Sequence, residues 1–178
     1  MTNNDILIRI RYALNITDIK LMELFALAGR RVGREELEPL FRKEGEPGWA
    51  ECDAATLRAF LEGLVASRRG PRETGGPRES AGTVAGARGG SVAGSAGSPA
   101  AGGPRPSLSM SNNEVLKHLR IALELKDGDI VDIMRAAGVE VSKSEIGALF
   151  RKKGHENWRQ CGDQFLRNFL AGLTAKRR

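Results

Sequence analysis

The chain has 178 residues, of which 40% are hydrophobic and 28% are charged, and these shares are ordinary for a soluble globular protein. No apolar run approaches the roughly 18 residues of a membrane span, and the first residues lack the pattern of a signal peptide, which argues against a membrane protein and a secreted one. With two cysteines in all, a disulfide framework is excluded, and we expect a reduced protein of the cytoplasm.

The net charge of +6 is unevenly distributed. Residues 3–69 hold 11 basic and 11 acidic residues, residues 112–178 hold 13 and 9, and the segment between them holds four Arg and two Glu. The first part is therefore neutral and the last part carries +4. A dedicated nucleic-acid module usually concentrates basic charge on one face, so the neutral first part argues against that class of protein.

The two outer parts of the chain are copies of each other. Residues 3–69 align without a gap onto residues 112–178 at a constant offset of 109, and 27 of the 67 aligned pairs are identical. The predicted architecture is therefore one module used twice, and a position kept in both copies serves something that the copies share. We place the modules at residues 1–69 and 111–178.

The first helix of each module is predicted to open with a capping box. Thr2 and Asp5 form it in the first module, and Ser111 and Glu114 form it in the second. Apolar residues then recur at the three- and four-residue spacing of a helix, which predicts a buried stripe. In the first module these residues are Ile6, Leu7, Ile10, Ala13 and Leu14.

Three more helices are predicted in each module. In the first module they span residues 18–29, residues 33–45 and the residues from 53 onward; in the second they span residues 127–138, residues 142–154 and the residues from 162 onward. Asp18 and Asp127 are interpreted as N-caps, and Gly45 and Gly154 as helix terminators. Because no β-strand alternation is evident, the predicted class is all-α, with two homologous four-helix modules.

Residues 70–110 separate the modules and consist mainly of Gly, Ala, Ser and Pro. Such a segment cannot bury enough apolar surface to offset the entropy of ordering, so we expect a long disordered linker. Its reach of roughly 35 Å allows the modules either to pack together or to stay apart. A recognition tail is the alternative, but no proline-rich motif, aromatic motif or dense charge block supports it.

Basic residues follow the apolar stripe of the third helix in both copies, as Arg42 and Lys43 and as Arg151 and Lys152. We expect them in the last helical turn, where cations offset the helix dipole by roughly 0.3–1 kcal/mol. A phosphate-binding pair is the functional alternative.

Further arginines are kept in both copies, Arg11 and Arg120 on the first helix and Arg58 and Arg167 on the fourth. They can form ion pairs across helices or bind an anion. Ion pairs are the preferred interpretation, because each module supplies acidic residues.

A Trp-x-x-Cys motif precedes the fourth helix, as Trp49 with Cys52 and as Trp158 with Cys161. A reactive thiol needs a base or a metal as a partner, and no His occupies a matching position in both copies. We therefore interpret the tryptophans as loop anchors and the cysteines as core residues. No zinc cluster, cofactor motif or catalytic constellation is present, so we predict no enzyme, no cofactor and no metal.

In the second module, residues 129–137 and 142–152 resemble a helix-turn-helix. Lys143, Ser144 and Gly147 would make a thin recognition surface, whereas direct base readout usually uses Arg, Asn or Gln. Nucleic-acid binding through the second and third helices, mainly of the second module, is therefore kept as an alternative function.

Gly63 and Gly172 interrupt the fourth helix in both copies. A glycine inside a helix costs about 1 kcal/mol relative to alanine, which predicts close approach of another helix. Each module is also near the size at which a single core is marginal. We therefore predict that the modules pack on each other as a pseudo-two-fold pair, with the two fourth helices in close approach. Two independent modules on a flexible tether are the alternative.

Several motifs kept in both modules resemble those of one family. They are the opening Asn-Asn-(Asp/Glu)-(Ile/Val)-Leu, the Leu-Phe-Arg-Lys and Trp-x-x-Cys motifs, and the closing Phe-Leu-x-Gly-Leu. Their combination resembles the YehS-like family of bacterial proteins, which is built from two copies of a domain of unknown function. The resemblance implies a bacterial cytoplasmic protein and supplies no catalytic residues.

The sequence thus predicts a non-enzymatic tandem module that binds another macromolecule. A protein-interaction or scaffolding role is preferred to nucleic-acid binding, and no membrane is involved. The candidate binding surface is basic and consists of Arg42, Lys43, Arg151, Lys152, Lys153, Arg177 and Arg178.

Overall fold

The computed structural model describes residues 1–69 and 110–177, and every regular element within them is an α-helix. The first module contains α1 (Asn3–Leu14), α2 (Asp18–Leu27), α3 (Arg34–Phe41) and α4 (Ala54–Arg69). The second contains α5 (Asn112–Ala122), α6 (Asp127–Ala136), α7 (Lys143–Leu149) and α8 (Asp163–Arg177). The predicted class, all-α with two four-helix modules, is confirmed.

The predicted linker lies outside the described residues, apart from its last residue. Met110, which the sequence assigned to the linker, is 6% exposed and belongs to the hydrophobic core. Met110 is the counterpart of Met1, which also packs against the core. The methionine before each capping box is therefore part of the folded core.

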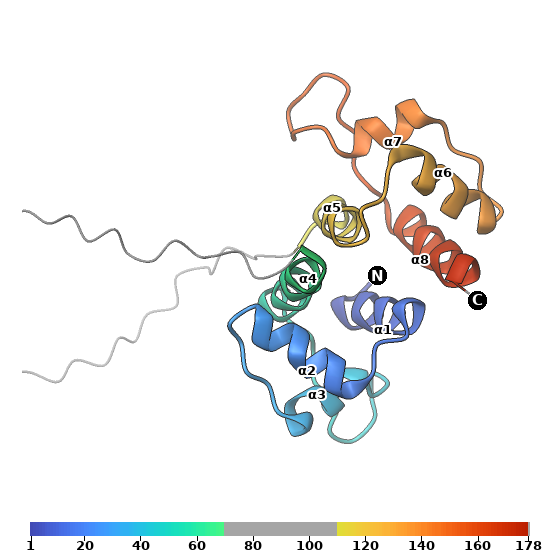
Figure 1. Cartoon of the computed structure of the whole chain (residues 1–178). Helices are drawn as coiled ribbons and strands as arrows, with labels where there is room; N and C mark the ends of the chain where they lie inside the picture. The colour runs from blue at the N-terminus through green and yellow to red at the C-terminus, as the bar shows by residue number, and fades with distance from the viewer. Residues whose placement is uncertain (70–109, 178) are drawn as a thin grey trace, which may run out of the picture.

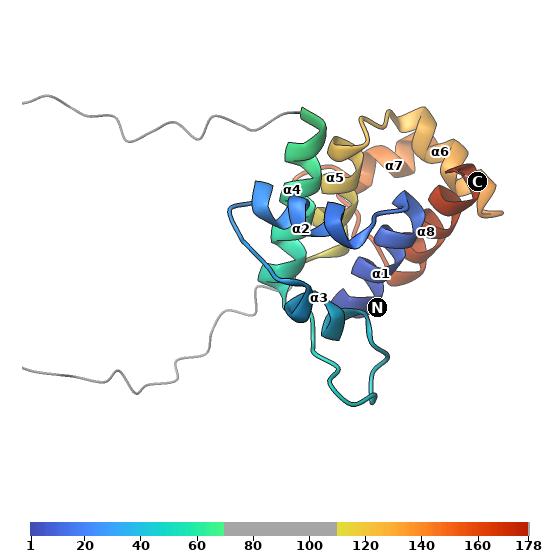
Figure 2. The same ribbon diagram turned by 60° about the horizontal axis from the view of Figure 1, so that its bottom comes forward.

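The first and fourth helices of each module pack on the other module. α1 lies along α8, and α4 lies along α5 (Figures 1 and 2). These four helices form a central layer, with α2 and α3 on one side of it and α6 and α7 on the other (Figure 1). Because the first helix of each module packs on the fourth helix of the other, the two modules are related as the halves of a two-fold dimer. The predicted packing of the modules on each other is confirmed.

The core continues from one module into the other. The apolar stripes predicted for the first helices are buried, and Leu7, Ile10 and Leu119 are fully inaccessible to solvent. Phe25 of α2 and Phe60 of α4 pack with their ring centres 6.1 Å apart. Burial of a single large apolar side chain stabilises a fold by about 1.5–3 kcal/mol, so this shared core holds the two modules together.

Gly63 and Gly172 allow close helix approach, but not between the two fourth helices. A Cβ atom on Gly63 would lie 1.8 Å from the carbonyl oxygen of Leu24 in α2. On Gly172 it would lie 1.9 Å from the carbonyl oxygen of Ile133 in α6. Each glycine therefore seats the fourth helix on the second helix of its own module, and the predicted approach of α4 to α8 through these glycines is wrong.

The N-caps of the first helices are as predicted, and those of the second helices are not. The Thr2 hydroxyl accepts from the Asp5 amide, and Ser111 accepts in the same way from Glu114. The N-cap of α2, however, is Thr17 rather than Asp18. An aspartate at the start of a helix can cap that helix or pair with a basic side chain, and the tertiary packing determines which of the two it does.

The third helices end earlier than the sequence indicated. α3 ends at Phe41 and α7 at Leu149, because an asparagine of the first helix captures a carbonyl group in the last turn. Asn4 Nδ2 donates to the Leu40 carbonyl at 3.0 Å, and Asn113 Nδ2 donates to the Leu149 carbonyl at 2.8 Å. These carbonyls would otherwise accept the next intrahelical bonds.

The predicted terminators lie in turns beyond the helices. Gly45 has a φ of +91° and Gly154 has a φ of +95°, a region that favours glycine. Arg42 and Arg151 therefore stand in the loops that follow the helices, and placing them in the last helical turn was wrong.

Candidate functional site

Two neighbouring asparagines tie the first helix to the Trp-x-x-Cys loop in each module. Asn4 Nδ2 also donates to the Ala50 carbonyl at 2.9 Å, and its Oδ1 accepts from the Cys52 amide at 2.8 Å. Asn3 adds a bond to the Cys52 carbonyl at 2.9 Å. Asn113 makes the equivalent bonds in the second module. This asparagine clamp fixes the Trp-x-x-Cys loop in each module, and in the second module Trp158 and Gln160 of that loop line a surface groove.

The cysteines are free and buried, as predicted. Cys52 is 0% exposed and Cys161 is 2% exposed. Burial raises the pKa of each thiol to about 12, and the neighbouring carboxylates of Asp53 and Asp163 add to the effect. Both thiols are therefore protonated at neutral pH, which does not suit a nucleophile or a metal ligand.

We expect both cysteines to resist alkylation in the folded chain. At pH 8 a thiol with a pKa of about 12 is ionised in only about one molecule in ten thousand, so iodoacetamide should label the native chain slowly and the guanidinium-unfolded chain quickly. Because the pKa is raised from 9.0, the thiols favour the folded state below pH 9, and this contribution declines as the pH rises from 9 towards 12. Rapid native labelling, followed by mass spectrometry, would contradict the assignment.

An arginine of the first helix holds an aromatic ring and an acid together in both modules. The Arg11 guanidinium carbon lies 4.4 Å from the centre of the Phe41 ring, and its Nη2 pairs with Asp18. The second module repeats the arrangement with Arg120, Phe150 and Asp127. The preferred interpretation as ion-paired residues is confirmed for Arg11 and Arg120, and the paired aspartates are the ones interpreted from the sequence as caps.

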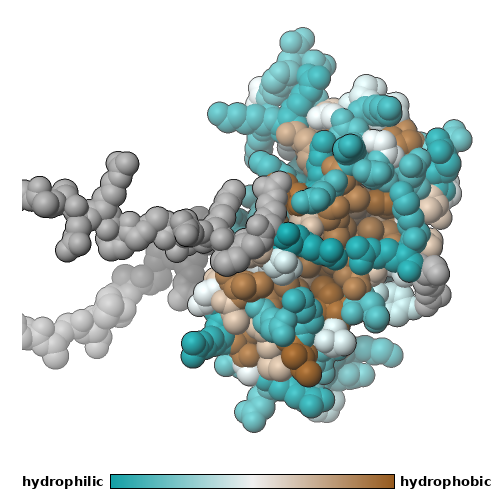
Figure 3. Space-filling model, viewed as in Figure 1, coloured by the Kyte–Doolittle hydropathy of each residue, from teal (hydrophilic) through white to brown (hydrophobic). Residues whose placement is uncertain are grey.

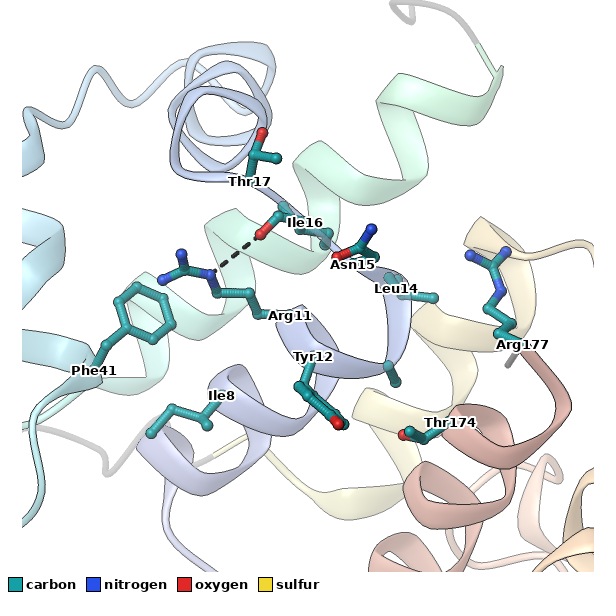
Figure 4. A pocket seen from close by; sticks show the side chains of 11 residues that line it. Ile8, Arg11, Tyr12, Leu14, Asn15, Ile16, Thr17, Phe41, Thr174 and Arg177 are labelled. Atoms are coloured by element: carbon teal, nitrogen blue, oxygen red, sulfur yellow. Dashed lines mark hydrogen bonds between the residues drawn. The ribbon is translucent and has the colours of Figure 1, made fainter.

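A first groove of about 1010 Å³ lies where the two modules meet. Ile8 and Tyr12 project into it from α1, while Phe41 closes one end and Arg177 of α8 stands on the far side (Figure 4). Ile8 is 36% exposed and Tyr12 is 61% exposed. The remaining lining residues are Arg11, Ala13, Leu14, Asn15, Ile16, Thr17 and Thr174.

The exposed large hydrophobic residues in the described part of the chain all belong to the first module. They are Ile8, Tyr12, Ile19 and Leu27. Figure 3 shows hydrophobic residues gathered near the middle of one face, between the two modules, with hydrophilic residues around its edges. The apolar surface is therefore concentrated on one copy and along the junction.

A second groove of about 690 Å³ belongs to the second module, between α5 and the loop that follows α7. Its charged lining is mainly basic, with Lys117 on α5 and Arg151, Lys152 and Lys153 in the loop. Half-buried Trp158 contributes an aromatic surface. The other lining residues are Ser111, Asn113, Glu114, Leu149, Phe150 and Gln160.

Comparison with known proteins identifies the modules. A family model described as "Protein of unknown function (DUF1456)" matches residues 3–70 and again residues 112–178. The chain belongs to the DUF1456 family. "Uncharacterized protein YehS" of Escherichia coli (strain K12) is 36% identical over 176 residues, covering 99% of this chain and 96% of that protein. The YehS-like family indicated by the motifs is therefore confirmed. No solved structure matches the chain.

In this DUF1456 chain the predicted basic surface is divided among separate places. Arg151, Lys152 and Lys153 line the second groove, and Arg177 lines the first. Arg178 lies outside the described residues.

The other two predicted residues lie in the loop after α3. Lys43 is exposed there, while Arg42 Nη1 donates to the Pro47 carbonyl at 2.5 Å and its Nη2 pairs with Glu38 at 2.9 Å. Arg42 therefore closes its own loop.

In a helix-turn-helix α7 would be the recognition helix, and it carries few basic groups. α6 and α7 do pack together, but α7 has seven residues, and its exposed positions include Lys143, Ser144 and Glu145. The arginine and lysines of the second groove follow this helix and do not lie on it. Across residues 1–69 and 110–177, no group of three or more His, Cys, Asp or Glu is placed to hold a metal ion. No helix in these ranges is both long and apolar enough to cross a bilayer.

Proposed function

We propose that this DUF1456 chain is a non-catalytic binding protein whose first groove receives an amphipathic segment of another protein. The observation that carries the proposal is the exposure of Ile8 and Tyr12, one helical turn apart, on the wall of a large open groove. Burial of exposed apolar surface is the main driving force of protein association. Apolar residues at this spacing suit a helix laid along a groove.

The charge at the edge of the groove indicates which segment fits. Arg177 stands across the groove from α1, and Lys176 precedes it in the last turn of α8. Arg11 adds little free charge, because it is paired with Asp18. A partner with apolar residues on one face and an acidic residue beside them would complement both the floor and the edge of the groove.

The second module supports this assignment, because it shows what the fold itself requires. The counterpart of Ile8 is Lys117, and α5 is a regular helix with a buried stripe on its other face. An apolar side chain at this position is therefore not needed for packing. Its presence in the first module alone favours a role in binding.

The residues kept in both modules support a role without catalysis. Asn4 is occupied in tying a loop, Arg11 holds Phe41 and Asp18, and the Cys52 thiol is buried and protonated. Each therefore has a structural partner that accounts for its retention in both copies.

The proposal is tested by selecting displayed peptides of random sequence on the full chain and measuring their affinity by fluorescence anisotropy. Selected peptides should combine spaced apolar residues with an acid. Ile8→Lys and Tyr12→Ser should each lower the affinity for the best peptide by about tenfold or more, which is the loss expected when a residue that anchors an interface is replaced. Ile19→Lys makes the same chemical change at a 68% exposed residue of α2 that does not line the groove, and should have little effect. Peptides that bind all three variants as tightly as the unchanged chain would refute the proposal.

A further inference from the structure

We infer that the second groove binds single-stranded nucleic acid, with its phosphates held by Lys117, Arg151, Lys152 and Lys153 and a base stacked on Trp158. This site is separate from the first groove and rests on different observations. Its position also differs from the helix-turn-helix surface, because its walls are α5 and the loop after α7.

Part of the basic character of this groove arises from substitutions between the two copies. Lys117, Lys153 and Gln160 occupy the positions of Ile8, Glu44 and Glu51 in the first module. All three line the groove, and each change makes the charge of the second copy more positive or less negative. The net charge of the second module, +4 against zero in the first, is thus partly focused on one concave surface.

Arg151 also lacks the acidic partner that its counterpart has. Arg42 pairs with Glu38 at 2.9 Å, but the residue equivalent to Glu38 is Gly147. Among the described residues, Arg151 forms no ion pair with a carboxylate, and its Nη1 lies 3.4 Å from Nδ1 of His155. Its guanidinium is therefore available for a phosphate, which it can bind through two parallel hydrogen bonds.

The acid that lines the groove is already engaged. Glu114 accepts from the Ser111 amide at 2.9 Å, and this bond is the main reason that its pKa is lowered. Its other oxygen lies 3.7 Å from Arg58 of the first module. The capping box and the contact between modules thus offset the negative charge that would repel a phosphate.

The aromatic residue favours a single strand over a duplex. Trp158 is half-buried in a loop that the Asn113 clamp holds in place, so its ring is positioned before a ligand arrives. A base can stack on a side chain only when it is not already stacked in a helix, and every base offers such a face. Cations from two elements around one aromatic ring therefore suit a strand without strong sequence preference.

Binding is measured with the full chain and fluorescein-labelled 15-nucleotide RNA and DNA of one sequence, by anisotropy at several salt concentrations. Four phosphate contacts should give a slope of log affinity against log salt of about −2.8, since each contact on a single strand contributes about 0.7. The RNA and DNA arms show which backbone the groove prefers. Trp49→Phe leaves Trp158 as the one fluorescent tryptophan, and its emission should be quenched on binding.

Two pairs of variants locate the site. Lys152→Glu with Lys153→Glu should weaken binding by about tenfold or more and reduce the slope by about 1.4. Arg9→Glu with Arg31→Glu alters the net charge equally at exposed residues of the first module that line neither groove, and should leave most of the affinity. Gly147→Glu restores the acid found in the first module and should weaken binding by about fivefold, the strength of a surface ion pair. Gly147→Ala adds only the methyl group, for which there is space, and should have no effect.

Several results would overturn the inference. One is an equal loss of affinity in the two charge-reversal variants, which would mean that only the overall charge of the protein matters. Another is equal binding by Gly147→Glu and Gly147→Ala. Unchanged emission from Trp158, tight binding of a duplex of the same sequence, or equally tight binding of an oligo-glutamate peptide would each exclude a single-strand site.

Discussion

Replacing Gly172 by alanine is expected to lower the free energy of unfolding by about 2–4 kcal/mol, even though alanine is the better helix former. The new methyl group would lie 1.9 Å from the carbonyl oxygen of Ile133 and 3.2 Å from its Cγ2 atom. A backbone oxygen cannot move without its helix, so α8 must shift away from α6 and lose contacts along its length. Urea unfolding followed by circular dichroism measures the change.

Gly147→Ala is the matched control for this prediction. Gly147 also lies inside a helix, but no atom lies within 4 Å of the added Cβ. Here only the helix propensity acts, and stability should rise by up to about 1 kcal/mol. The two substitutions should therefore change stability in opposite directions, and a gain from both would contradict the close approach of α6 and α8.

Residues 110–178 expressed alone are expected to form a homodimer rather than a stable monomer. In the full chain α5 packs on α4 and α8 packs on α1, so removal of the first module exposes the apolar surfaces of both helices. A second copy offers the same two helices in the same relation, which makes it the available replacement. Because folding is then linked to association, the melting temperature should rise with protein concentration.

The full chain provides the control, since its partner module is covalently attached and its melting temperature should not depend on concentration. Analytical ultracentrifugation and thermal unfolding at several concentrations give both measurements. A monomer that melts at the same temperature as the full chain would show that the modules fold independently.

The sequence predicted the features that depend on neighbouring residues. The capping boxes at Thr2 and Ser111 are local interactions, and the structure contains them both. The apolar stripe of α1 has the period of a helix and is buried at Ile6, Leu7 and Ile10. Both features occur in each of the two copies, so each prediction rested on two independent segments of sequence.

Features that depend on distant partners were not predictable in the same way. The end of α3 is decided by Asn4, which lies 36 residues away and captures the Leu40 carbonyl. Aspartate is a residue type typical of an N-cap, but Asp18 instead forms an ion pair with Arg11. Gly63 indicated a close contact correctly, and yet nothing in the sequence told whether α2 or α8 would make it.

The lining of the second groove shows the same division. Arg151, Lys152 and Lys153 were among the residues predicted from the sequence, but Lys117, which lines the same groove, was not, because it lies on another helix, far away in the chain. Comparison of the two copies contains a signal for it, since a lysine replaces Ile8 at a position that the repeat makes equivalent. Differences between copies can therefore indicate function where identities indicate only the fold.

The reciprocal packing of the modules has a consequence for how such a protein can change over generations. In a homodimer made by one short gene, every mutation appears in both subunits, so the two halves must stay alike. When both halves lie in one chain, each can mutate alone while the shared core keeps them together. Ile8 and Lys117 occupy matching places and differ in both size and charge. Fusion thus turns a symmetric assembly into a molecule with two unlike faces, each open to selection for its own task.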